Sequence, residues 1–154
     1  MSATPDSTAG GPVVVAYDGS ELSRLAIDEA GQLLSAGREA LVVCVWQPFD
    51  VGFVPVDDAP FDAKQARAVQ AAAERTAAAG ASLAAAAGFT ARSLAVEAAP
   101  TWKGIVATAK ERDAAAIVLG SHGRSGLAGK LLGSVAAAVA DHSRRTVVIV
   151  HRHE

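Results

Sequence analysis

The sequence predicts an α/β protein: a single-domain, open, five-stranded parallel sheet with helices on both faces. Five short apolar runs alternate along the chain with segments of helical composition, which is typical of β-α-β units. These runs are continuously apolar, so the strands are expected to be buried on both faces of a parallel sheet. With 154 residues the chain fits one domain, and we expect residues 1–11 to be a flexible lead-in and residues 12–154 to form that domain.

The first apolar run, PVVVAYD, predicts a buried strand that ends at Asp18. In the segment that follows, Ser20 is a suitable N-cap for a helix, and Gly37 is expected to close that helix. One apolar stripe at helical spacing supports this assignment, formed by Leu22, Leu25, Ala26, Ala30, Leu33 and Leu34.

The run ALVVCVW predicts the second strand, and three prolines mark residues 47–62 as a loop. Residues 63–87 are rich in alanine and are expected to be helical, with Gly80 as a weak point or a break. The third strand is expected at ARSLAVEA, and a helix at TWKGIVATAKER follows Pro100. The remaining elements are a strand at AAAIVLG, a helix within LLGSVAAAVADHS and a strand at TVVIVH.

The composition argues against several classes of function. A net charge of −2 offers no basic surface for nucleic acid. No run reaches about 18 strongly apolar residues, and the N-terminus lacks the features of a signal peptide, so we expect a cytoplasmic protein without a membrane segment. The single cysteine, Cys44, is expected to be a small buried apolar residue, and Trp46 and Trp102 are expected to be packing residues.

Glycine is concentrated in the segment GSHGRSGLAGKLLGS, residues 120–134, which contains five of the 14 glycines. The segment begins at the carboxyl end of the fourth predicted strand and leads into a helix that starts near Gly133 and Ser134. Ligands of open parallel sheets bind past the carboxyl ends of the strands. Glycine permits positive φ and close backbone approach, and a helix N-terminus attracts phosphate. The segment is therefore interpreted as a phosphate cradle.

The local charge agrees with an anionic ligand, because residues 114–140 contain no Asp or Glu but include Arg124 and Lys130. Two other phosphate-binding loops are excluded. Lys130 is followed by Leu131 and not by Ser or Thr, as a Walker A loop requires. The turn after the first strand reads YDGSELS, which lacks a dinucleotide-binding GxGxxG. His122 is expected to be a solvent-facing loop residue, because no carboxylate lies near it in sequence.

The cradle contains the pattern Gly-x2-Gly-x9-Gly-Ser, formed by Gly120, Gly123, Gly133 and Ser134. This pattern resembles the ATP-binding motif of the universal stress protein family. The resemblance extends over residues 13–151 and includes the Asp-Gly-Ser that follows the first strand. It implies a Rossmann-like, adenine-nucleotide-binding fold with strand order 3-2-1-4-5, usually homodimeric, with ATP between the ends of strands one and four.

The resemblance also implies a role for each site residue. Asp18 meets the adenine or ribose end of ATP, and the backbone of Val45 meets the adenine edge, while Ala16 and Leu119 line the pocket. Ribose and phosphates are held by Gly120, Gly123, Gly133, Ser134 and Val135. The strand order by itself makes strands one and four neighbours, so Asp18 and Gly120 should face one crevice. One departure is Ala98, where the family often has glycine, and its methyl group is expected to narrow the site.

The cradle offers no positioned base and no carboxylates for a catalytic metal, so no catalytic or metal-binding residue is assigned. The favoured function is a nucleotide-dependent regulatory stress-response protein that binds ATP, with or without magnesium, and has at most slow ATP turnover. The alternative is a dimeric stress-response scaffold that binds no nucleotide. An adenylating or nucleotide-transferring enzyme is a weaker alternative, because the SGGxDS loop of such enzymes is missing from YDGSELS.

The last predicted strand, TVVIVH, favours a homodimer. The order 3-2-1-4-5 leaves this strand at an edge of the sheet, and residues 146–150 contain no Pro or Lys to discourage pairing with a second copy. In the alternative, a monomer, the C-terminal residues HRHE and nearby loops cover this edge.

Overall fold

The computed structural model describes residues 10–48, 63–123 and 132–152, and it confirms the predicted fold class. The five strands are parallel and lie in the order β3-β2-β1-β4-β5. The strands are β1 (Val13–Ala16), β2 (Glu39–Trp46), β3 (Thr90–Glu97), β4 (Ala116–Gly120) and β5 (Thr146–Val150). The helices are α1 (Glu21–Leu33), α2 (Ala63–Ala86), α3 (Thr101–Glu111) and α4 (Ser134–His142).

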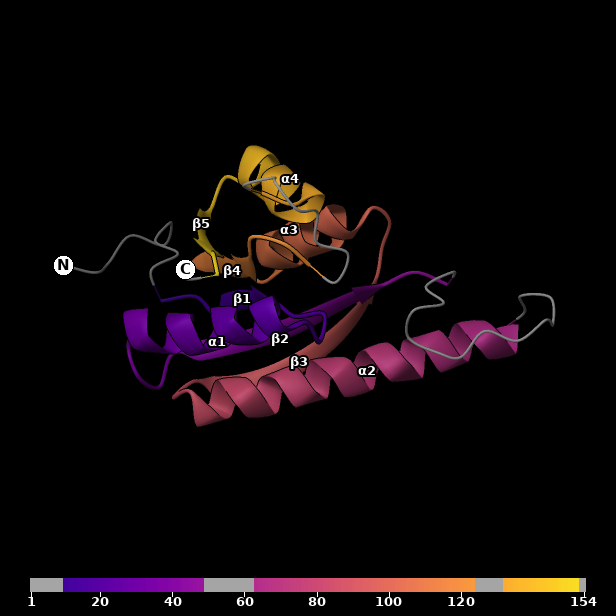
Figure 1. Cartoon of the computed structure of the whole chain (residues 1–154), viewed down its shortest axis with the longest axis horizontal. Helices are drawn as coiled ribbons and strands as arrows, with labels where there is room; N and C mark the ends of the chain where they lie inside the picture. Colours follow the sequence, from indigo (N-terminus) through magenta and orange to yellow (C-terminus); the bar gives the residue numbers. More distant parts are fainter. Residues whose placement is uncertain (1–9, 49–62, 124–131, 153–154) are drawn as a thin grey trace.

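The helices form two layers, one on each face of the sheet (Figure 1). Successive side chains of β1 alternate between the two faces, as the pleat of a strand requires. Val13 and Val15 belong to the apolar cluster under α1 and the C-terminal half of α2, and Val14 belongs to the cluster under α3 and α4. All three are at most 1% exposed, which explains why the strand reads as a continuous apolar run.

The sequence predicted the start of α1 correctly but not its end. Ser20 is the N-cap as expected, and its hydroxyl accepts a hydrogen bond from the Ser23 N–H at 3.2 Å. The prediction that Gly37 closes α1 is wrong, because the helix ends at Leu33. Gly37 has a φ of +79° and donates its N–H to the carbonyl of Gly88 at 2.8 Å. This glycine thus joins the turns that precede β2 and β3.

Helix α2 continues through Gly80, so the expected break is absent. A Cβ at this position would lie 2.6 Å from Cδ2 of Tyr17 and 2.7 Å from Cγ1 of Val42. Gly80 therefore allows α2 to pack closely on Tyr17 and Val42, and this packing compensates for its low helix propensity. Within the described part of the chain, no helix is long and apolar enough to cross a membrane.

Candidate functional site

The described ends of the glycine-rich segment meet at the carboxyl edge of the sheet. Just after β4, the Ser121 N–H donates to the carbonyl of Val150 on β5 at 2.8 Å. The carbonyl of Ser121 in turn accepts the Gly133 N–H at 2.6 Å, which holds the start of α4 beside the end of β4. Arg124 and Lys130 lie outside the described residues, so the structure does not place them.

Asp18 and Gly123 face one another across this edge. One carboxylate oxygen of Asp18, Oδ1, accepts the Ser20 N–H at 3.0 Å. The other, Oδ2, lies 2.8 Å from the position that a Cβ on Gly123 would occupy. The expected partner, Gly120, is instead covered by Leu22 of α1, whose Cγ lies 2.9 Å from the position of a Cβ.

Tyr17, between β1 and Asp18, carries a buried phenol. Burial raises its pKa above the ordinary value, and the neighbouring charges of Asp18 and Cys44 raise it further, while Arg24 acts in the opposite direction. The phenol is therefore neutral near pH 7.

The cradle glycines are required for space and not for backbone conformation. Among the described glycines, positive φ occurs at Gly19, Gly37 and Gly88. Of the two properties of glycine considered from the sequence, positive φ is not used at Gly120, Gly123 or Gly133. At Gly133 a Cβ would lie 3.1 Å from the carbonyl oxygen of Ser121, so a side chain there would press on the backbone of the loop.

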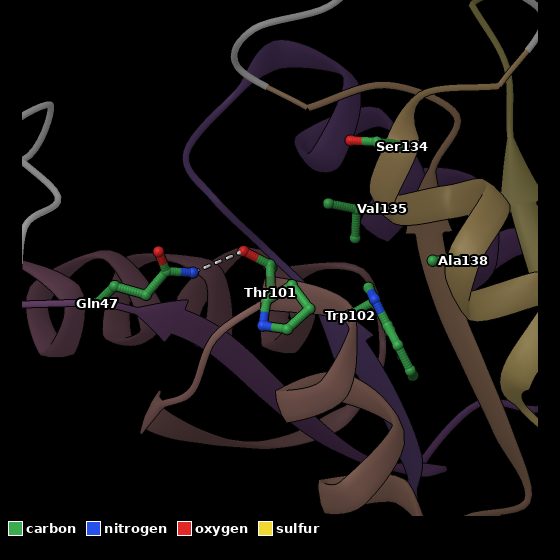
Figure 2. A pocket seen from close by; sticks show the side chains of 7 residues that line it. Gln47, Thr101, Trp102, Ser134, Val135 and Ala138 are labelled. Carbon is green, nitrogen blue, oxygen red and sulfur yellow. Dashed lines mark hydrogen bonds between the residues drawn. The ribbon is translucent and has the colours of Figure 1, made fainter.

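A cavity of about 440 Å³ lies between the end of β2 and the first turns of α3 and α4 (Figure 2). Its volume is within the roughly 300–1,000 Å³ of typical small-molecule sites. On one side, Gln47 Nε2 donates to the Thr101 hydroxyl at 3.4 Å, and on the other Ser134 and Val135 project from α4. The lining residues are Gln47, Pro100, Thr101, Trp102, Ser134, Val135 and Ala138.

Two helix N-termini open at this cavity without a side-chain cap. The N-cap residues are Pro100 for α3 and Gly133 for α4, and neither helix has an acidic residue in its first turn. Helix α1, by contrast, has both a serine cap and Glu21 in its first turn. Uncapped N–H groups and the positive end of the helix dipole favour a bound anion. The site thus combines an apolar cavity with two positively polarised helix ends.

The remaining predicted residues lie behind the cavity and do not line it. Ala16 is partly buried and Leu119 is 3% exposed, and both pack in the cluster under α3 and α4. Val45 and Ala98 lie against Gly104 of α3, where a Cβ would be 3.1 Å from the Val45 side chain and 2.9 Å from the Ala98 methyl group. The Ala98 methyl therefore occupies space that Gly104 leaves open, and Ala98 is absent from the cavity lining.

His122 is placed differently from the prediction. Its imidazole is partly buried, with Nδ1 3.2 Å from the Ser121 hydroxyl. Its Nε2 is buried and has no hydrogen-bond partner among the residues that the structure describes. Gly133 lies close to this imidazole, because a Cβ on Gly133 would lie 3.4 Å from Cδ2 of His122. The expectation of a solvent-facing histidine is therefore wrong.

The family model described as the universal stress protein family matches residues 11–151. The chain belongs to the universal stress protein family. The curated relatives that it matches include the universal stress proteins Rv2005c of Mycobacterium tuberculosis (strain H37Rv) and Mb2028c of Mycobacterium bovis. Each is 37% identical over 152 residues, and the match covers 92% of this chain and 45% of the relative. The chain thus spans a little under half the length of these family members.

Several solved structures share the fold. A universal stress protein in complex with cAMP is 32% identical, with a TM-score of 0.66 and coverage of 93% of this chain and 98% of that one. The protein MJ0577 has a TM-score of 0.77 at 21% identity, covering 95% and 99% of the two chains. The Archaeoglobus fulgidus family member in complex with dAMP has a TM-score of 0.58 at 22% identity, covering 90% and 96%. At the 21% and 22% identity of the last two structures, the similarity shows a shared fold and nothing further.

The motif predicted Ser134 and Val135 at the site, but sequence reasoning missed Gln47, Thr101 and Trp102. The sequence did contain a signal for two of these residues. Gln47 directly follows β2 and Thr101 follows the end of β3 by a few residues, and the carboxyl ends of parallel strands meet at one edge of the sheet. Trp46 and Trp102 are packing residues as predicted: Trp46 is 6% exposed, and Trp102 is partly buried against the core cluster under α3 and α4, where it also lines the cavity.

Proposed function

We propose that this universal stress protein binds an adenine nucleotide, ATP in particular, and acts as a nucleotide-dependent regulatory protein in the stress response. The main support is the pair of uncapped helix N-termini, α3 and α4, at one cavity on the carboxyl edge of the sheet. The cavity takes the base and the helix ends favour the phosphates. The cAMP complex of a family member 32% identical to this chain supports the same class of ligand.

In this proposal the phosphates lie along the backbone of Gly120 and Gly123 and at the start of α4. Gly133, Ser134 and Val135 supply the N–H groups and hydroxyl of that helix end, and Arg124 and Lys130 supply positive charge. The base lies in the cavity beyond the carboxyl end of β2, next to Gln47. The contact of the Val45 backbone with the adenine edge stays a prediction from the family resemblance, because Val45 does not line this cavity. Ala16 and Leu119 support the site from the core.

Nucleotide extraction tests this function most simply. The purified protein is incubated with ATP, with and without magnesium, freed of unbound ligand and denatured, and the released nucleotide is identified by chromatography. We expect about one ATP for each chain, and cAMP in competition shows which adenine nucleotide is preferred. Complete absence of released nucleotide would favour the dimeric scaffold instead. Because we assign no catalytic residue, we expect the bound ATP to be recovered with at most slow conversion to ADP.

Replacing Asp18 by alanine should weaken the binding of ATP but not the binding of inorganic triphosphate. The carboxylate beside Gly123 can accept hydrogen bonds from the ribose or adenine, groups that tripolyphosphate lacks. Removing it should cost about tenfold in ATP affinity, the effect of losing about 1.4 kcal/mol. Titration calorimetry with ATP and with tripolyphosphate measures both affinities. Equal weakening of the two ligands would show that Asp18 does not lie at the nucleoside end.

We also propose a cytoplasmic homodimer that pairs through β5. This strand lies at an edge of the sheet, and Val147, Val148 and Ile149 remain only partly buried. The opposite edge strand, β3, carries an exposed ion pair between Arg92 and Glu39 at 2.7 Å, which makes that edge less suited to pairing.

The substitution Val148→Pro should convert the dimer into monomers or aggregates. Proline removes a backbone donor from β5 and cannot continue a regular ladder. Light scattering at high micromolar concentration gives the mass, and circular dichroism shows whether the variant is folded. A wild-type protein that is monomeric at this concentration would rule out the dimer.

A further inference from the structure

We propose that Trp102 is the wall of the cavity against which the nucleobase packs, and that His142 positions the indole for this contact. The inference rests on the proposed nucleotide-binding function and assigns the residue that distinguishes a nucleotide from a bare phosphate chain. Trp102 is the second residue of α3 and lies in the first helical turn beside the cavity. It is only partly buried, so part of a large aromatic surface remains available to a ligand.

The indole is held in place from α4. The rings of Trp102 and His142 are stacked, with centroids 4.0 Å apart and an interplanar angle of 20°. His142 Nδ1 lies 2.9 Å from the carbonyl oxygen of Ala138, one turn earlier in the same helix. Because a carbonyl oxygen only accepts hydrogen bonds, Nδ1 is the donor, and this bond fixes the imidazole plane. The stack therefore links the two helices that border the cavity and orients the indole before a ligand arrives.

The rest of the cavity matches a planar base with a polar edge. Val135 and Ala138 supply apolar surface from α4, and Figure 2 shows the Trp102 ring beside them. Gln47 and Thr101 provide an amide and a hydroxyl, which offer both donors and acceptors. Aromatic side chains stack on every kind of nucleobase, because each base has a π face. An aromatic wall opposite polar groups is suited to binding a nucleobase, and it contributes nothing to the binding of inorganic phosphate.

Calorimetry with ATP and tripolyphosphate tests the role of Trp102. Trp102→Leu keeps apolar volume but removes the aromatic ring, and we expect ATP affinity to fall at least about tenfold. Trp102→Phe keeps a ring and should stay within about threefold of wild type. Tripolyphosphate affinity should be the same in all three proteins. ATP affinity in Trp102→Leu equal to wild type would overturn the inference while leaving the proposed function intact, whereas no ATP binding by wild type would overturn both.

The positioning role of His142 has its own readout. His142→Ala should weaken ATP about threefold, and His142→Phe, which can restore a stacked ring, should recover that loss. Unchanged ATP affinity in His142→Ala would show that the stack does not position the wall.

Fluorescence provides a measurement that does not depend on truncating Trp102. In Trp46→Phe, Trp102 is the sole tryptophan, and its emission should change on addition of ATP but not of tripolyphosphate. In Trp102→Phe, the remaining Trp46, which is 6% exposed in a core cluster with α2, should give a constant emission. Unchanged Trp102 emission with ATP bound would contradict the proposed contact.

Discussion

Gly123→Val should reduce ATP affinity by about a hundredfold, equivalent to about 2.8 kcal/mol. A Cβ at this position already lies 2.8 Å from Oδ2 of Asp18, and the branched side chain adds two methyl groups. Valine therefore both displaces the carboxylate and fills the gap between Asp18 and the backbone of Gly123. Both effects are expected to weaken the binding of the nucleotide at this part of the loop. Because Gly123 is exposed and its φ is not positive, the fold itself should be little affected.

Gly10→Val is the matched control, because a Cβ on Gly10 meets nothing within 4 Å. Titration calorimetry should give wild-type ATP affinity for Gly10→Val and greatly weakened binding for Gly123→Val. Thermal melts without ligand should agree for both variants, which separates loss of the site from loss of the fold. Wild-type affinity in Gly123→Val would mean that the nucleotide does not contact this part of the loop.

Gly80→Leu should destabilise the fold by about 3 kcal/mol or more. Helix propensity alone predicts the opposite sign, a gain of nearly 1 kcal/mol on replacing glycine in the middle of α2. The packing decides the outcome, because a Cβ would lie 2.6 Å from the Tyr17 ring and 2.7 Å from Val42, both of which are buried. Overpacking of this core contact forces α2 away from the sheet.

Denaturant unfolding measures the change, and Ala79→Leu provides the control at the adjacent, exposed position of the same helix. That variant should stay within about 0.5 kcal/mol of wild type. If Gly80→Leu were as stable as Ala79→Leu, the close approach of α2 to Tyr17 and β2 would be incorrect.

The layout of the fold was predictable from local patterns, but several glycine roles were not. Continuous apolar runs identified β1, β2, β4 and β5, whereas β3 was identified by its alternation of apolar and polar residues and is only partly buried. Gly37 and Gly80 were assigned by local rules, as a helix end and a weak point. Each is instead determined by a distant partner, Gly88 for Gly37 and Tyr17 for Gly80. Contacts between residues far apart in sequence leave no trace in propensity.

The candidate site was likewise predictable only where the sequence has a local signature. The glycine motif located the start of α4 and the cavity residue Ser134, because a helix N-terminus after a strand has a local signature, and the family resemblance added Val135. Trp102 was predicted to be a packing residue, since nothing near it in sequence indicates a cavity. Its exposure depends on the gap between α3 and α4, and its orientation depends on His142, forty residues away. Arg124 and Lys130 remain predictions from the sequence.

A thermal melt with and without ATP and magnesium tests the central claim, that the carboxyl edge of this sheet binds a nucleotide. ATP at about 100 times its dissociation constant should stabilise the fold by about 2.7 kcal/mol and raise the melting temperature accordingly. Gly123→Val should melt at the same temperature with and without the ligand, which ties any shift to the cradle. A wild-type melting temperature that does not change at millimolar ATP would contradict the account.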